Sequence, residues 1–243
     1  IKNMDYIIAD PNLIKKEEEE LYSEEILYLP NIWNSMSKPK NLPNVNILPA
    51  KNSSIFTFGS FNNFSKISNE TLKIWARILN DSNSRLILKS DGAKSDETNE
   101  NILKKFKQYV NKENKVLILD RSLTTKEHLA EYNKIDLALD TFPYPGVTTS
   151  FEAILMGVPV LTMKGYNFNS RCGESINLNL NIKEFIATST DDYYNKALRI
   201  QKDLDILSET RASLRQNALA SPLFDTKTFT KDFSQILKKT LNK

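Results

Sequence analysis

The sequence predicts an α/β protein built on a doubly wound parallel sheet. From residue 54 onward, apolar runs typical of strands alternate with segments of helical spacing, as in folds of this class. Within residues 135–163, an apolar run, a Pro/Gly loop, a helical segment and a second apolar run follow one another, which is the pattern of a βαβ unit. Together these observations indicate a Rossmann-like domain.

Residues 1–50 differ from the rest of the chain. Strands are expected at DYIIAD and EILYLPN, with the charged segment KKEEEELYSEE, helical or loop, between them. The next stretch contains several prolines and shows little helical or strand periodicity, which indicates a linker. Two strands cannot bury a core alone, so we expect this piece to pack against the main domain or against a part of the protein outside the chain. Because the chain opens on Ile1 rather than methionine, we expect a fragment or a processed chain.

The regular part begins with the strand IFTFGSF and the polar loop NNFSK. Ser68 is a good N-cap residue for the helix TLKIWARIL, and Ile67 before it can pack on Leu72, as in a hydrophobic staple. Two further strands are expected at RLILKS and KVLILD, with a charged helix over residues 99–111 between them. A short helix over residues 125–132 then leads to the strand LALDT.

The helix inside the βαβ unit is expected to begin at a Thr and end at a Gly. Thr149 is a suitable N-cap, Glu152 stands at the capping-box spacing, and Gly157 can supply the left-handed residue after the helix. The helix N-terminus would lie at the carboxyl edge of the sheet, where free N–H groups favour an anion. From these residues alone, a tight connection without a ligand explains the loop equally well.

The strand PVLTM closes the unit, and mostly helical segments follow it. Helices are expected over residues 171–178 and over a long run at 191–219, with a short apolar piece near Phe185 between them. The tail should form one more helix, because four apolar residues share one face: Phe229, Phe233, Ile236 and Leu237.

Composition excludes several classes of function. The chain has 243 residues, with 33 Lys and Arg interspersed among 30 Asp and Glu, so the charge does not indicate nucleic-acid binding. Cys172 is the only cysteine and His128 the only histidine, which argues against disulfides and against Cys-rich or His-rich metal sites. No apolar run is long enough to span a membrane, and a reducing, cytoplasmic setting is expected. Neither GxGxxG nor GxxxxGK[ST] is present, so neither dinucleotide nor P-loop chemistry is supported.

Polar residues follow the predicted strands at the edge where the unit's helix begins. Asn63 and Lys66 come after the first strand, with Gly59 and Asn62 beside them, and an ammonium there could neutralise a phosphate. A solvated loop lysine is the competing interpretation. His128 could contact a ligand ring or simply decorate a helix surface. Arg171, in the segment SRCGES, could meet an anion or a carboxylate, and the acid pairs of the charged helices are explained by solvent exposure.

Four segments follow one another along the chain: FGSFNNFSKI, LALDTFPYPGVTTSFEAILMGVPVLTM, NSRCGESI and SPLFDTKTFTKDF. In this order and spacing they resemble the catalytic region of the O-linked N-acetylglucosamine transferase family. The likeness is to bacterial members with upstream tetratricopeptide repeats, and it covers nearly the whole chain. It implies the C-terminal half of a two-lobed GT-B glycosyltransferase. Residues 1–50 would end the N-terminal lobe and cross over, residues 51–224 would form the donor-binding lobe, and residues 225–243 would form a helix packing back on the N-terminal lobe.

The resemblance also implies a donor site, residue by residue. Lys66 matches the lysine that contacts the donor diphosphate and is the candidate catalytic residue, and Asn63 matches a nearby polar position. His128 falls at a histidine that packs near the uridine.

The remaining implied contacts come from the helix of the βαβ unit. Thr148 and Thr149 match paired threonines that hold phosphate, and Glu152 matches an acidic position that binds ribose hydroxyls, a role that competes with the predicted capping box. Val147 departs from the family pattern, in which better-known members have histidine.

The leading hypothesis is therefore the donor-binding half of an inverting, metal-independent transferase. It would move N-acetylglucosamine or another hexose from a UDP-sugar to protein side chains, with no cofactor. Its partners would be a protein or peptide acceptor, the upstream lobe and tetratricopeptide repeats. The alternatives are a non-catalytic nucleotide-binding or scaffold domain with a degenerate pocket, and, third, a sugar-phosphate epimerase or a GT-B transferase with a free glycan acceptor.

Overall fold

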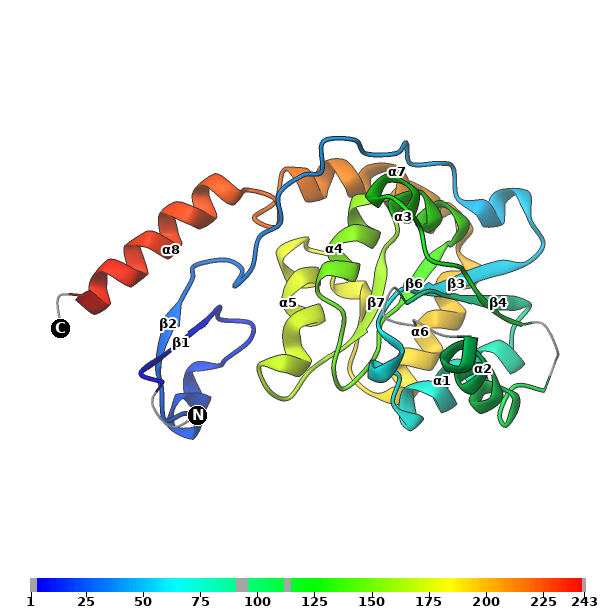
Figure 1. The fold of residues 1–243 in the computed structure, drawn as a ribbon, viewed down its shortest axis with the longest axis horizontal. Helices are drawn as coiled ribbons and strands as arrows, with labels where there is room; N and C mark the ends of the chain where they lie inside the picture. Colours follow the sequence, from blue (N-terminus) through cyan, green and yellow to red (C-terminus); the bar gives the residue numbers. More distant parts are fainter. Residues whose placement is uncertain (1–3, 91–95, 112–114, 242–243) are drawn as a thin grey trace.

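The computed structural model describes residues 4–90, 96–111 and 115–241. Its main body is a six-stranded parallel sheet with helices on both faces (Figure 1). The strands lie in the order β5-β4-β3-β6-β7-β8. Their bounds are Phe56–Ser60 (β3), Ser84–Leu88 (β4), Val116–Ile118 (β5), Leu137–Leu139 (β6), Val160–Met163 (β7) and Ile186–Ala187 (β8). The predicted doubly wound α/β fold is confirmed.

The strand order reverses between β3 and β6. The chain runs outward from β3 through β4 to β5, returns to pair β6 with the other side of β3, and then continues outward through β7 to β8. A crevice forms at the carboxyl ends of the strands on either side of such a switch point, because the two connections leave toward opposite faces. The topology therefore places the candidate site after β3 and β6.

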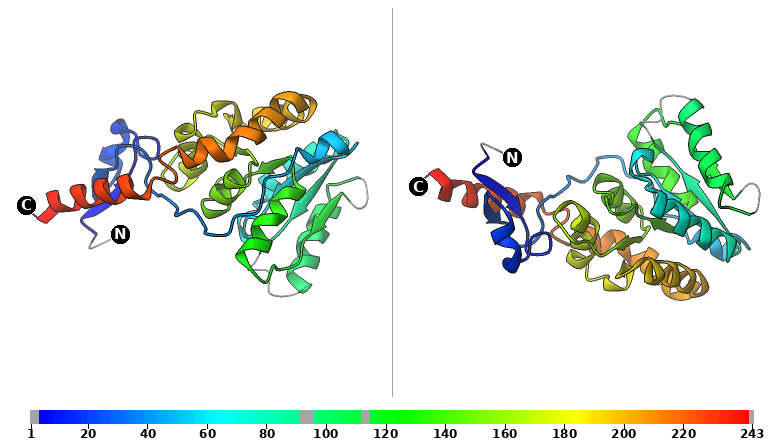
Figure 2. Two further views of the ribbon diagram at one scale, coloured as in Figure 1. Left: turned by 90° about the horizontal axis from the view of Figure 1, so that it is seen from above. Right: turned by 90° about the horizontal axis from the view of Figure 1, so that it is seen from below.

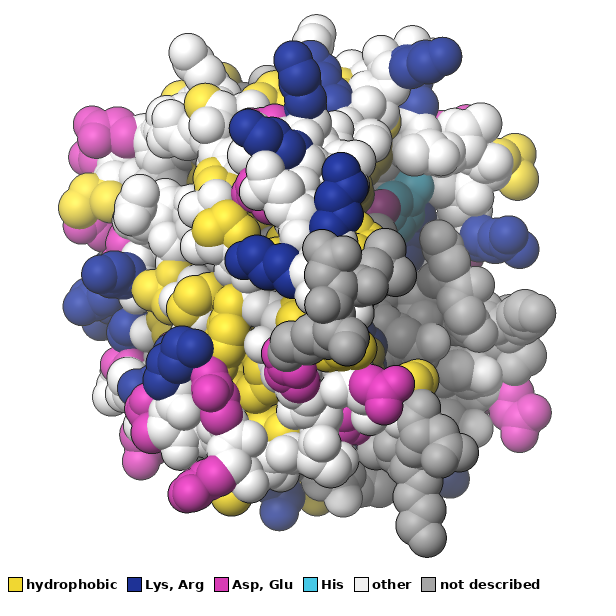
Figure 3. Space-filling view, turned by 90° about the vertical axis from the view of Figure 1, so that its left-hand side faces the viewer, with side chains coloured by type: hydrophobic (Ala, Val, Ile, Leu, Met, Phe, Trp, Pro, Cys, Tyr) yellow, Lys and Arg dark blue, Asp and Glu magenta, His cyan; other side chains and the backbone are white. Residues whose placement is uncertain are grey.

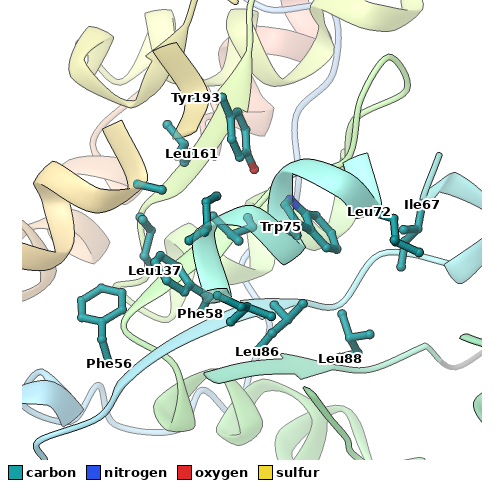
Figure 4. Close-up of a cluster of buried hydrophobic side chains, with 14 of the residues drawn as sticks. Phe56, Phe58, Ile67, Leu72, Trp75, Leu86, Leu88, Leu137, Leu161 and Tyr193 are labelled. Atoms are coloured by element: carbon teal, nitrogen blue, oxygen red, sulfur yellow. The ribbon is translucent and has the colours of Figure 1, made fainter. Parts of the chain in front are cut away.

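Alternating strand residues supply two separate cores. Leu86 and Leu137 pack in the cluster on one face, whereas Ile87 and Ala138 pack in the cluster on the other, as the two-residue period of a strand requires. The first face is covered by α1 (Asn69–Asn80), α2 (Asp96–Lys107) and α6 (Thr190–Lys202), and the second by α3 (Thr125–Glu131), α4 (Thr148–Leu155), α5 (Cys172–Asn179) and α7 (Leu204–Leu219). Figure 4 shows Trp75 of α1 and Tyr193 of α6 in the first core.

Each predicted helix is present, but some bounds differ: α2 spans Asp96–Lys107 rather than residues 99–111. Ser68 caps α1 by accepting from the Thr71 N–H at 3.0 Å. The helix expected over residues 191–219 is wrong, because it divides at Asp203 into α6 and α7. Asp203 leaves the helical region (φ −103°, ψ 72°), and its carboxylate accepts from the Ile206 N–H at 3.3 Å to begin α7. An aspartate can satisfy a new helix N-terminus in this way without Gly or Pro.

A small second unit contains β1 (Tyr6–Ala9) and β2 (Glu25–Tyr28), which pair in parallel. The last helix, α8 (Thr226–Leu241), leaves the main body and lies beside this unit (Figures 1 and 2). They share one apolar cluster, formed by Leu27, Leu29 and Ile236 with Tyr6, Ile8, Phe229 and Phe233 against it. Figure 3 shows apolar side chains among interspersed charges at this end of the molecule. The proposed boundaries between lobes stay a prediction.

Buried polar contacts join the small unit to the main body. Asp10 accepts from the Trp33 N–H at 3.0 Å and from the Ser175 hydroxyl at 2.7 Å. Arg171 forms a bidentate pair with Glu18, at 2.5 and 2.6 Å, and the guanidinium lowers the pKa of the Glu18 carboxyl to about 2. Of the two roles considered for Arg171, the structure shows the contact to a carboxylate.

The loop after β6 is organised by the buried carboxylate of Asp140. Its Oδ1 accepts from the Gly146 N–H at 2.6 Å and from the Asn62 amide at 3.0 Å, and its Oδ2 accepts from the Thr162 hydroxyl at 2.9 Å. Burial raises the pKa of Asp140 to about 6, although these donors and the charge of Lys66 oppose the rise. The carboxylate therefore ties together the ends of β3 and β6, strand β7 and the loop that leads into α4.

We expect Gly157→Ala to lower the free energy of unfolding by about 2 to 4 kcal/mol. Gly157 has φ +72°, and a Cβ there would lie 2.7 Å from Val45 Cγ1 and 2.9 Å from the Arg211 carbonyl oxygen. Urea denaturation measures the change. Asn181→Gly is the control, because Asn181 also has positive φ (57°) and glycine relieves that strain; its stability should be unchanged or higher. Equal stability of Gly157→Ala and wild type would contradict the prediction.

Asp140 should make stability depend on pH. Its pKa is about 6 in the folded chain and about 4 when unfolded. Its stabilising contribution is therefore complete below about pH 4 and is lost as the pH rises through about 6. The stability of wild type relative to Asp140→Asn, which does not titrate, should fall by on the order of 3 kcal/mol across this window and then stay level. Urea denaturation of both proteins at several pH values tests this, and a difference that is constant or rises with pH would contradict it.

Candidate functional site

A cavity of about 460 Å³ lies at the carboxyl edge of the sheet, by the switch point. It is bounded by the loops that follow β3, β4 and β5 and by the N-terminal parts of α3 and α4. Five of the six predicted site residues line it: Asn63, His128, Thr148, Thr149 and Glu152. The sixth, Lys66, is not among the lining residues; it lies three residues after Asn63, on the loop between β3 and α1.

Lys66 is held against the loop that precedes α4. Its Nζ donates to the Pro145 carbonyl at 2.9 Å and lies 4.1 Å from the centre of the Tyr144 ring. Burial lowers the pKa of the Lys66 ammonium, while the nearby Asp140 and Cys172 act in the opposite direction. Lys66 is therefore a half-buried, positioned cation rather than a freely solvated loop lysine.

Asn62 and Asn63, which are adjacent in the same loop, form hydrogen bonds with different partners. Asn63 uses its Oδ1 to accept from the Ser65 N–H at 3.0 Å, which closes the short turn before α1. Asn62 is buried, and it donates to Asp140 while accepting from the Thr149 hydroxyl at 2.5 Å. Asn62 thus links the buried carboxylate to the first turn of α4.

The predicted capping box in α4 is wrong. The helix begins at Thr148 after Val147, and no side chain caps it. Thr149 already lies inside the helix with its hydroxyl turned to Asn62, and Glu152 bonds to His128 of α3. Both side chains form hydrogen bonds with residues of other elements instead of capping their own helix. The spacing of residues within the helix does not reveal such partners. The Ser150 and Phe151 N–H groups donate to the Val147 carbonyl at 3.0 Å, whereas those of Thr148 and Thr149 have no hydrogen-bond partner among the described residues, which favours an anion there.

The opposite wall carries a chain of polar side chains. His128 Nε2 lies 3.0 Å from Glu152 Oε2, and the Tyr132 hydroxyl lies 3.3 Å from the same oxygen and 3.1 Å from the Thr149 carbonyl oxygen, to either of which it can donate. The side chains of His128 and Glu152 are only 14% and 17% exposed. The alternative that His128 decorates a helix surface is therefore wrong.

Sequence reasoning missed two cations in the cavity wall, Lys89 and Arg121. Lys89 is almost completely buried, and its Nζ lies 2.6 Å from the Ser122 hydroxyl and 2.7 Å from His128 Nδ1. A lysine that directly ends a buried parallel strand was the available signal, because that position faces the ligand edge of the sheet. Phe61 was also missed; it adds an apolar ring whose centre lies 6.0 Å from the centre of the His128 ring.

The cavity thus combines features suited to a large, partly anionic ligand. Two cations line it, Thr148 and Thr149 bring the N-terminus of α4 to it, and Lys66 is held against the loop that leads into this helix. His128 and Phe61 provide aromatic rings, and Glu152 provides an acceptor for hydroxyl groups. Among the residues that the structure describes, no group of three or more His, Cys, Asp or Glu is arranged to hold a metal ion. None of the described helices is long and apolar enough to cross a membrane.

Comparisons with known proteins identify the family. The profile of glycosyl transferase family 41 matches residues 42–233. A Solanum lycopersicum protein named as a probable UDP-N-acetylglucosamine–peptide N-acetylglucosaminyltransferase SPINDLY is 33% identical over 239 residues, which are 98% of this chain and 26% of the relative. The chain therefore spans about a quarter of the length of that plant protein.

Solved structures agree with the fold. A mutant O-GlcNAc transferase of Thermobaculum terrenum has 30% identity and a TM-score of 0.88, over 97% of this chain and 45% of that one. Sucrose-phosphate synthase of Thermosynechococcus elongatus, at 15% identity and a TM-score of 0.67, covers 99% of this chain and 59% of its own and shows the fold alone. The predicted GT-B fold and family resemblance are confirmed, and the chain belongs to glycosyl transferase family 41.

Proposed function

We propose that the chain is the donor-binding half of a protein glycosyltransferase. The enzyme transfers N-acetylglucosamine or another hexose from a UDP-sugar to protein side chains with inversion. One observation carries this proposal: a single cavity at the switch point joins the open first turn of α4, the cations Lys89 and Arg121, and the carboxylate of Glu152. The names of the plant relative and of the Thermobaculum enzyme support the same donor and a peptide acceptor.

The diphosphate end of the donor is assigned to Lys66, Thr148, Thr149 and Asn63. An ammonium carries three donors, so Lys66 can keep its bond to the Pro145 carbonyl and still donate to a phosphate oxygen. The Thr148 hydroxyl and the N–H groups of Thr148 and Thr149 bind the other oxygens, while the Thr149 hydroxyl keeps its proton on Asn62. Negative charge grows on the departing UDP in the transition state, so these fixed donors stabilise it more than the ground state. Lys66 is the catalytic residue in this sense.

The nucleoside end is assigned to His128 and Glu152. The rings of His128 and Phe61 provide apolar surface for a base, and the Glu152 carboxylate accepts from ribose hydroxyls. Glu152 is free to do so because it is not folded back on its own helix. No catalytic base is assigned to this chain.

The remaining components are also proposals. The reaction needs no metal and no cofactor, since Lys66 and the start of α4 supply the positive charge at the leaving group. The upstream lobe, with tetratricopeptide repeats before it, supplies the acceptor side, and the partner is a protein or peptide rather than a nucleic acid. We assign a cytoplasmic setting, in keeping with the single buried cysteine.

A second candidate is a non-catalytic scaffold with a degenerate donor pocket. Val147 favours it, because this residue packs against two apolar clusters and offers no polar contact at the start of α4. The two candidates differ in whether a nucleotide binds.

UDP should raise the thermal and chemical stability of the chain. A ligand at about 100 times its dissociation constant adds about 2.7 kcal/mol to the free energy of unfolding. Denaturation with and without UDP measures this, and inorganic phosphate at equal concentration is the control for a nonspecific anion effect. No shift with UDP or any other nucleotide would reject donor binding in favour of the scaffold.

Lys66→Ala should weaken UDP binding by roughly 1.5 to 3 kcal/mol, the usual size of a hydrogen bond to a charged group, and should abolish turnover in the full-length protein. Titration calorimetry measures the affinity. Lys73→Ala is the matched control, since Lys73 is an exposed lysine on α1, and its affinity should equal that of wild type. If Lys66→Ala binds UDP as wild type does, Lys66 is not part of the site.

A further inference from the structure

The buried Lys89 makes a contact that constrains the protonation of His128. Its Nζ lies 2.7 Å from His128 Nδ1, and an ammonium has donors but no acceptor. His128 Nδ1 must therefore accept, and in the neutral ring the remaining proton is on Nε2. That proton points at Glu152 Oε2, 3.0 Å away. Hydrogen bonds thus join the end of β4 to helix α3 and helix α3 to helix α4. In each of them the donor is defined: Lys89 donates to His128, and His128 donates to Glu152.

We infer that Lys89 is a positioning residue, which holds His128 in the Nε2-protonated tautomer so that His128 in turn orients Glu152 for the donor. The inference rests on the proposed function for the identity of the ligand, a nucleoside diphosphate sugar. Its core, the proton on His128, can be measured without any ligand.

The geometry gives Glu152 two distinct oxygens. Among the described residues, the polar contacts to its carboxylate, from His128 at 3.0 Å and from the Tyr132 hydroxyl at 3.3 Å, both fall on Oε2. Oε1 is left to accept from a ligand hydroxyl. If His128 carried its proton on Nδ1 instead, Nε2 would face Oε2 as a second acceptor, and the carboxylate would turn away. The tautomer therefore decides whether Glu152 is fixed before the ligand arrives, which lowers the entropy lost on binding.

Lys89 is itself held in place for this task. It is 1% exposed and also bonds to the Ser122 hydroxyl at 2.6 Å, and its Nζ lies 6.0 Å from the centre of the Phe61 ring. A buried ammonium needs hydrogen-bond acceptors to offset its lost hydration, and His128 Nδ1 and the Ser122 hydroxyl are two of them.

The test uses the chain's single histidine. With nitrogen-15 in histidine only, NMR distinguishes protonated from unprotonated ring nitrogens, and there is one ring to observe. Wild type at neutral pH should show Nε2 protonated and Nδ1 unprotonated. Glu152→Ala should keep this pattern, because Lys89 alone suffices to set it. Lys89→Met combined with Glu152→Ala should populate both tautomers, whereas the exposed-lysine control, Lys126→Met combined with Glu152→Ala, should not.

Protonated Nδ1 in wild type would overturn the inference whether or not any variant folds. A mixture of tautomers in Glu152→Ala alone would also overturn it, because the glutamate rather than the lysine would then set the proton.

UDP affinity provides the functional readout. Lys89→Met should weaken binding about tenfold, and Lys89→Arg, which keeps a donor toward His128, should recover most of the loss. In a His128→Ala background the effect of Lys89→Met should disappear. If it persists undiminished there, Lys89 acts on the ligand directly and is not a positioning residue. If wild type fails to bind UDP, the proposed function fails, while the tautomer measurement still decides the link between Lys89 and His128.

Discussion

The carboxylate of Asp140 is the interaction on which the site depends. It stands at the end of β6, beside the switch point, and it receives donors from the β3 loop, from β7 and from the loop that leads into α4. Gly146 must lack a side chain to approach it, since a Cβ there would lie 2.5 Å from the Thr149 hydroxyl and 2.7 Å from Asn62 Oδ1. The direction in which α4 enters the cavity is therefore set by one buried group rather than by the helix itself.

The start of α4 is open because its own side chains are used elsewhere. Thr149 bonds to Asn62, and Glu152 bonds across the cavity to His128. A capped helix would have satisfied its first N–H groups internally and would have had less to offer an anion. The same two contacts thus leave the N-terminus available and fix the walls on each side of it. The helix therefore lacks the stabilisation of a side-chain cap, and its side chains instead hold the site in a fixed arrangement.

The fold could be predicted because its signals are local and repeated. Apolar runs such as RLILKS and the helical face around Trp75 indicate strands and helices without knowledge of their neighbours. The site was only partly predictable, because its decisive contacts join residues distant in the chain. The predicted capping box was wrong because Asn62 and His128 bind the side chains of Thr149 and Glu152. The helix break at Asp203 was not predicted because no Gly or Pro marks it. Lys89 was missed because its position directly after a strand indicates the ligand edge of the sheet but does not reveal that the side chain is buried.

The polar chain through Lys89, His128 and Glu152 also bears on the choice between an enzyme half and a scaffold. Buried charged groups lose their hydration on folding, and the interactions that replace it usually do no more than balance that loss. Such a network is a poor way to stabilise a sheet edge, which apolar packing would serve better. It is an effective way to present fixed donors and acceptors to a ligand. Val147 offers no polar contact at the start of α4, but the opposite wall keeps each member of its network bonded. The desolvation of these buried charged groups is better explained by a pocket that binds a nucleotide than by one that has lost its ligand.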